Sequence, residues 1–142
     1  MWASVIAVVG TLLGSMTTYL VQQRGTDRAA LRRDRLSAVT AVATALADHR
    51  RAMWVREDLR LSGAEAATYE AARAESHTTR SALTAPLTVL AILAPALAAV
   101  AQEAATATYD LRGAETAQAL NDARESAIAA CEHLIREAAK TF

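Results

Sequence analysis

The first 23 residues carry no charged side chain, and five arginines follow within the next twelve positions. An uncharged, mostly apolar stretch of this length can cross a bilayer as one helix. Basic residues stay on the cytoplasmic side of such a helix. The sequence therefore predicts a transmembrane anchor over residues 1–24, with its N-terminus outside the cytoplasmic membrane and residues 25–142 inside. The arginines expected to orient the anchor and to contact anionic lipid headgroups are Arg24, Arg28, Arg32, Arg33 and Arg35.

Small residues recur at steps of three and four within the predicted anchor. Gly10 and Gly14 form a GxxxG motif, and Ala3 and Ala7 extend the same ridge. Small side chains let two membrane helices approach closely, so packing can hold them together. We expect a homo-oligomer through this face, although small residues are also common in membrane helices for other reasons.

The composition indicates an all-α protein. Glycine (5) and proline (2) are scarce, whereas alanine, leucine, arginine and glutamate, which favour helices, dominate. The 15 basic residues balance the 15 acidic ones. A dedicated nucleic-acid-binding protein usually has a basic excess, so direct binding of nucleic acid is not expected. The load of arginine and alanine is typical of a GC-rich bacterial genome.

Three cytoplasmic helices are expected, at about 27–61, 64–111 and 114–141. Ser62 and Glu65 have the spacing of a capping box between the first two, and Pro86 and Pro95 should bend the second. Arg50, Arg51, Arg56 and Arg60 are expected on a solvated face of the first, together with Asp48, Glu57 and Asp58. The helices should form an antiparallel hairpin or three-helix bundle with coiled-coil-like packing. Its heptad positions in the second helix are Tyr69, Ala72, Ser76, Thr79, Leu83, Pro86, Leu90, Leu93, Leu97, Val100, Ala104, Ala107 and Leu111.

Residues 81–102 carry no charge, so hydropathy allows a second reading of this segment. It could cross or enter the membrane, which would make the chain a membrane-perturbing or pore-forming protein, holin-like or toxin-like. The two prolines and the one-sided distribution of leucines favour instead a helix buried in a bundle. Both readings stay open on the sequence alone.

The sequence contains no constellation that predicts catalysis, a cofactor site or a metal site. His49, His77 and His133 lie in separate segments, and no HxxxH or CxxC pair occurs. We therefore expect a protein that is not an enzyme. His49 is expected to be a hydrogen-bonded interface histidine, and Cys131 a small buried residue. Trp54 lies near the predicted turn, where it either contacts a partner or packs against the hairpin.

Four segments carry a resemblance to a known family. They are VVGTLLG (8–14), LRRDRL (31–36), DHRRAMW (48–54) and TRSALTAP (79–86). The chain resembles the small KilB-like membrane proteins of actinomycetes, which are associated with the spread of conjugative plasmids. The predicted anchor, the small-residue ridge and the heptads together predict a membrane-anchored helical adaptor or assembly protein that docks partner proteins at the cytoplasmic face. The resemblance adds that this role is accessory to plasmid spread, beside the plasmid-transfer machinery. It assigns no functional residue, because its motifs are patterns of packing and charge.

Overall fold

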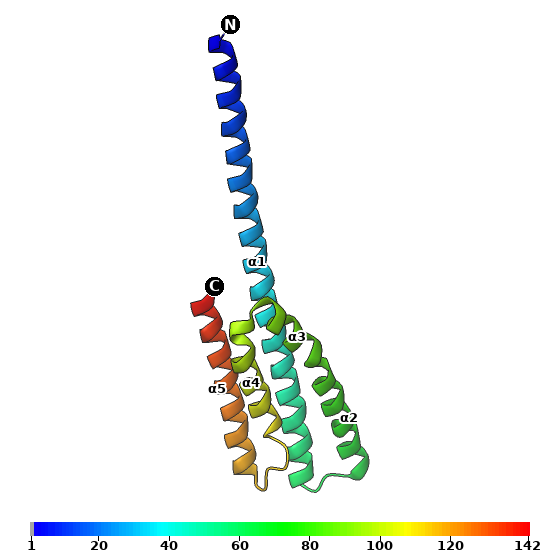
Figure 1. Cartoon of the computed structure of the whole chain (residues 1–142). Helices are drawn as coiled ribbons and strands as arrows, with labels where there is room; N and C mark the ends of the chain where they lie inside the picture. Colours follow the sequence, from blue (N-terminus) through cyan, green and yellow to red (C-terminus); the bar gives the residue numbers. More distant parts are fainter. Residues whose placement is uncertain (1) are drawn as a thin grey trace. The chain divides into compact units, whose positions relative to one another are not determined.

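The computed structural model describes the backbone of residues 2–142 and the side chains of residues 26–142. Every regular element in this part of the chain is helical, which confirms the all-α prediction. Along the chain these elements are the long helix α1, four shorter α-helices and one 3₁₀ turn, η1 (Figure 1). Their bounds are α1 Trp2–Leu61, α2 Ala66–Ala82, α3 Thr84–Leu93, η1 Pro95–Leu97, α4 Ala98–Tyr109 and α5 Ala117–Thr141.

The chain divides into two compact units, Met1–Asp34 and Arg35–Phe142. The side chains of the predicted anchor and of its small-residue ridge at Ala3, Ala7, Gly10 and Gly14 lie outside the described residues. Within residues 26–142, whose side chains are described, no helical segment is long and apolar enough to cross a membrane.

The unit Arg35–Phe142 is a helical bundle in which the chain reverses direction three times. The last 27 residues of α1 lead to a turn at Gly63, α2 and α3 return alongside them, α4 runs back, and α5 returns again (Figure 1). The structure therefore differs from the single helix expected over 64–111. That segment is divided at Leu83 and Ala94, and the second division reverses the chain rather than bending it.

Both divisions follow from the prolines. Pro86 has no N–H to donate to the carbonyl group of Ala82, so α2 ends there and Pro86 lies in the first turn of α3, where that N–H is not needed. Residues before a proline avoid the helical region. Ala94 accordingly leaves it, with φ −143° and ψ 67°, and Pro95 begins η1.

The turn after α1 is closed by a Schellman motif rather than by the predicted capping box. Gly63 has a φ of 67°, and the N–H of Ala64 bonds the carbonyl oxygen of Leu59 at 3.0 Å. The Ser62 hydroxyl donates back to Leu59, and Glu65 precedes α2 without making a side-chain cap. The capping-box prediction was therefore wrong. Thr116 immediately precedes α5, and its side-chain oxygen caps that helix by accepting a hydrogen bond from the N–H of Ala119.

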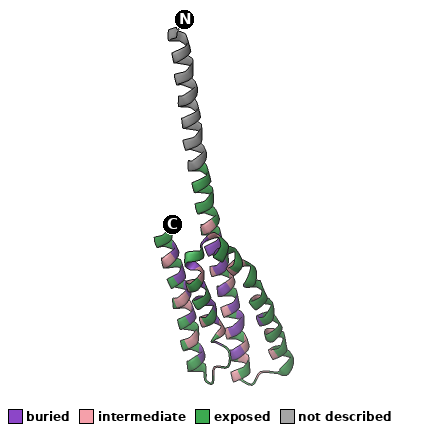
Figure 2. Ribbon diagram, in the orientation of Figure 1, coloured by how far each residue is buried: buried purple, intermediate pink, exposed green. Residues whose placement is uncertain are grey.

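The core consists mainly of alanine and leucine side chains on the facing sides of α1, α3, α4 and α5 (Figure 2). One buried row follows seven-residue spacing through α2, α3, η1, α4 and the next turn. Its members are Ser76, Leu83, Leu90, Leu97, Ala104 and Leu111. These residues belong to the heptad read from the sequence, and no side chain in the row is more than 2% exposed.

The uncharged segment 81–102 supplies much of this core. Leu83, Leu90 and Leu97 are buried in the same core cluster as Val42 and Leu46 of α1 and Leu134 of α5. The segment is divided among the end of α2, α3, η1 and the start of α4. Its leucines are therefore in contact with other helices of the same bundle.

Candidate functional site

A polar cluster fastens the end of α1 to the turn between α4 and α5. At its centre is Glu57, whose side chain is 1% exposed. Its Oε2 accepts from Arg60 Nε at 2.6 Å and from the N–H of Gly113 at 3.2 Å. Arg60 also donates to the carbonyl oxygen of Ala114. Gly113 has a φ of 79°, which favours glycine in this turn.

Arg56 completes the cluster on the side of α2. Its Nε lies 3.5 Å from Glu57 Oε1, which is an ion-pair distance without hydrogen-bond geometry. Its Nη1 reaches the Ser76 hydroxyl at 3.5 Å. Glu57 and Arg56 thus connect α1 to both α2 and the α4–α5 turn.

The burial of Glu57 corrects the expectation that this residue lies on a solvated face. Among the other residues expected there, Asp48, Arg51, Asp58 and Arg60 are exposed. A signal for this burial was present in the sequence. The buried positions of α1 follow steps of three and four through Leu46, His49 and Met53, and the next step reaches Glu57. The prediction of an exposed Glu57 rested on its charge, whereas its position in this spacing indicates burial.

His49 is buried between α1, α2 and α4. Its Nδ1 lies 3.0 Å from Thr79 Oγ1, and Thr79 Oγ1 is also within bonding distance of the Glu75 and Ser76 carbonyl oxygens. Because the threonine proton goes to a carbonyl group, the pattern assigns His49 Nδ1 as the donor. Nε2 then has no hydrogen-bond partner, so only one of the two ring nitrogens of His49 is hydrogen-bonded. Burial, followed by the charges of Arg80 and Arg56, lowers the pKa of His49 to about 4.

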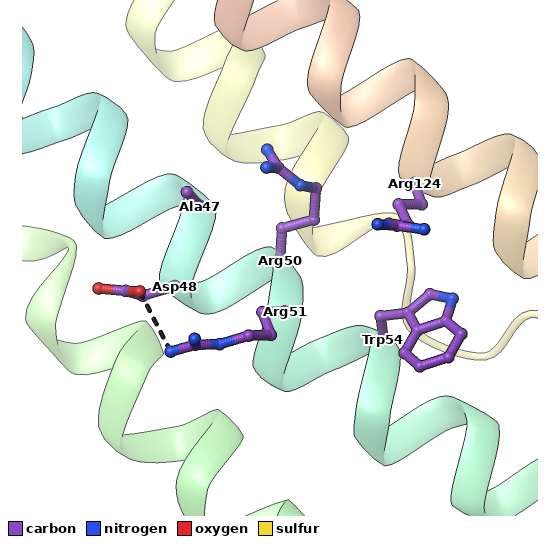
Figure 3. Close-up of a pocket in the computed structure, with 6 residues that line it drawn as sticks. All are labelled: Ala47, Asp48, Arg50, Arg51, Trp54 and Arg124. Atoms are coloured by element: carbon purple, nitrogen blue, oxygen red, sulfur yellow. Dashed lines mark hydrogen bonds and ion pairs between the residues drawn. The ribbon is translucent and has the colours of Figure 1, made fainter.

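Trp54 packs against α5 (Figure 3). Its Nε1 donates to Asn121 Oδ1 at 3.4 Å, and the Arg124 guanidinium lies over its ring, 5.8 Å from the centroid. The ring borders a shallow pocket of about 420 Å³ that is also lined by Arg50 and Arg51. Asp48 pairs with Arg51 at 3.3 Å in an exposed position. Trp54 therefore contacts the bundle itself, while part of its ring remains accessible to a partner.

Of the five arginines expected at lipid headgroups, three are exposed, one packs within the bundle, and one lies outside the described side chains. Arg28, Arg32 and Arg33 are exposed, whereas Arg24 lies outside the described side chains. Arg35 donates from Nε to the carbonyl oxygen of Leu93 at 2.8 Å, and its guanidinium lies over the Phe142 ring at 5.7 Å. Arg35 thus ties α1 to the ends of α3 and α5.

An apolar groove of about 590 Å³ runs between α1 and α5. Its floor is formed by small side chains, among them Ala43, Ala47 and Ala138, and by Cys131. Leu36 and Ile135 border it and are 46% and 48% exposed. Burial raises the pKa of the Cys131 thiol, as expected for a small core residue. The groove could not be predicted from sequence patterns, because its lining combines residues 36–48 of α1 with residues 131–139 of α5, which are distant in the sequence.

Within residues 26–142, no cluster of three or more histidine, cysteine, aspartate or glutamate side chains could hold a metal ion. His49, His77 and His133 lie on three different helices: α1, α2 and α5. The described part of the chain carries an apolar groove and two pockets lined by arginines.

Comparison with known proteins places this bundle in a family. The family model described as KilB plasmid transfer protein matches residues 36–142, which is nearly the whole compact unit. Protein KilB of Streptomyces lividans is 56% identical over 145 residues, covering 100% of this chain and 99% of the relative. The chain belongs to the KilB plasmid transfer protein family. No solved structure matches it.

The Glu57 cluster leads to a prediction about stability. Glu57→Ala leaves Arg56 and Arg60 without their shared carboxylate, so the free energy of unfolding should fall by about 3 kcal/mol. Glu70→Ala is the matched control, because Glu70 pairs with Arg73 on α2 with both side chains at least half exposed. It should cost less than about 0.5 kcal/mol. Urea unfolding of the full chain in detergent, followed by circular dichroism, measures both. Equal losses would contradict the role given to Glu57.

His49 predicts a dependence of stability on pH. The unfolded chain takes up a proton at His49 near pH 6.5, whereas the folded chain does so only near pH 4. The stability due to the neutral imidazole is complete above pH 6.5 and is lost as the pH falls toward 4, by about 3 kcal/mol in all.

The measurement compares the wild-type chain with His49→Gln at pH 7.5 and pH 4.5 in phosphate-free buffer. Wild type should lose about 2–3 kcal/mol more than the variant on acidification. If the two proteins lose the same free energy, His49 is not held neutral by the fold.

Proposed function

We propose that the chain acts in plasmid transfer as a membrane-anchored, non-enzymatic helical adaptor. Family membership supports the process, since the matching family is described by plasmid transfer. The uncharged residues 1–23 and the arginines that follow support an anchor in the cytoplasmic membrane, with the bundle on the cytoplasmic side. On this proposal, the bundle docks proteins of the plasmid-transfer machinery.

The observation that carries the adaptor role is the groove between α1 and α5. Exposed apolar surface of this kind marks interaction sites in proteins. Its alanine floor admits a close approach, and its two large border residues, Leu36 and Ile135, are about half exposed. Water therefore contacts apolar surface that a second helix would cover.

The occupant that fits this groove best is a second copy of the chain. The same face carries both large apolar side chains and a hollow floored by small ones. In a two-fold dimer, a residue that contacts a position on the partner is contacted in return by that position. Leu36 and Ile135 of one copy would then fill the alanine-lined hollow of the other. Self-association through the ridge at Ala3, Ala7, Gly10 and Gly14 is proposed for the same dimer.

A crosslinking experiment tests anchoring and self-association together. Ile135→Cys is introduced into the full chain with Cys131→Ala, the membranes are isolated, and a bismaleimide is added. We expect the chain in the membrane fraction and a covalent dimer as the main product. The matched control is Thr78→Cys in the same background, since Thr78 is exposed on α2, and it should remain monomeric.

Two results would contradict the proposal. Recovery of the chain in the soluble fraction would contradict the proposed membrane anchor. Equal dimer yield from positions 78 and 135 would indicate random collision rather than an interface at the groove.

A further inference from the structure

A cavity of about 260 Å³ lies between α1, α2 and the turn that follows α4. Four arginines line it: Arg56 from α1, Arg73 and Arg80 from α2, and Arg112 from the turn. The remaining lining comes from His49, Met53, Ser76, His77 and Tyr109. None of these residues is acidic, although the chain as a whole is neutral.

The positive charge around this cavity is only partly balanced. Arg56 shares Glu57 with Arg60, and Arg73 pairs with Glu70 at 3.4 Å in an exposed position. Among the ion pairs between described side chains, none involves Arg80 or Arg112. The Arg80 guanidinium lies over the Tyr109 ring, 4.6 Å from its centroid. Like charges held close together in a partly buried site repel one another. An anion bound here would reduce the repulsion among these arginines.

Buried polar atoms at the same cavity provide an independent observation. His49 is 1% exposed, lines the cavity and has no partner for Nε2. Arg56 Nε is likewise buried without a hydrogen bond. Buried polar groups are nearly always paired in native proteins. Arg56 Nε is a donor, and His49 Nε2 becomes a donor when the ring takes up a proton, so an anion in this cavity would give both nitrogens a partner.

We infer that this cavity binds a small anion that carries a phosphate group. Planar guanidinium groups match the oxygen geometry of phosphate with paired N–H donors, and the lining brings four of them together. The volume is slightly below the range of roughly 300–1,000 Å³ found for sites of drug-sized ligands. The ligand is therefore a small phosphate compound or a single headgroup.

Such a ligand would tie α2 to the rest of the bundle. Ser76 is the one residue buried in α2, and α2 reaches α1 through the polar contacts Thr79–His49 and Ser76–Arg56. A phosphate group held by Arg56, Arg80 and Arg112 would join three segments. A ligand that binds only the folded state also stabilises it.

Inorganic pyrophosphate is the probe, titrated calorimetrically into the full chain in phosphatidylcholine nanodiscs. We expect saturable binding with one site per chain. The double variant Arg80→Gln, Arg112→Gln should bind about tenfold or more weakly, because it loses two charge-assisted donors. The matched control, Arg136→Gln, removes an exposed arginine of α5 that pairs with Glu132, and it should bind as the wild type does.

A second readout separates loss of the site from loss of the fold. Negative charge beside an imidazole favours its protonated form. The pKa of His49 should therefore rise when pyrophosphate is added, as followed by NMR of the histidine ring, and the helical circular dichroism of each variant should match wild type. No saturable binding by the wild type, equal binding by the double variant, or an unchanged His49 pKa at saturation would each overturn the inference.

A lipid headgroup carries the same phosphate chemistry as a soluble compound, so a further arm distinguishes the two sources. The titration is repeated in nanodiscs that contain phosphatidylglycerol. A weaker apparent affinity for pyrophosphate would show that the headgroup competes for the cavity. An unchanged affinity would assign the cavity to a soluble phosphate compound.

Discussion

The bundle depends on the burial of one row of side chains at seven-residue spacing, among them Leu83, Leu90 and Leu97. The row continues through a complete reversal of the chain at Ala94 and Pro95. Because these leucines meet α1 and α5 largely at alanines, valines and other leucines, the helices approach closely with few aromatic residues. One face of this uncharged segment thereby lies inside the bundle, whereas Val89 and Ile92 remain exposed at 46% and 73%.

The bundle contains two kinds of interface, and each suggests its own kind of binding. The seam between α1 and α5 is apolar, and its groove remains partly open to water. The seam between α1 and α2 is polar and joined by Thr79–His49 and Ser76–Arg56 contacts. The first suits association with another helix, and the second suits an anion.

Periodicity predicted many of the buried apolar residues, among them Leu90, Leu97 and Leu134, because helix geometry sets that spacing. It also placed Leu31 on the packing face, where the side chain is 41% exposed. It did not predict the reversal at Pro95, since a proline can bend a helix or end it and only tertiary packing decides between them. Nor did it predict which residues pair with Glu57, the apolar groove between α1 and α5, or the arginine-lined cavity. Each of these depends on residues from segments that are distant in sequence, such as Gly113 beside Glu57. The anchor predicted over residues 1–24 remains a prediction.

The most direct test of the central claim compares two substitutions two residues apart in α3. Leu90 is fully buried, whereas Ile92 is 73% exposed. If the segment 81–102 is bundle core, Leu90→Ala should lower the free energy of unfolding by about 3 kcal/mol, and Ile92→Ala by less than about 0.5 kcal/mol. Urea unfolding of the full chain measures both. Equal effects, or a larger effect at Ile92, would contradict the bundle and would indicate that this segment packs differently.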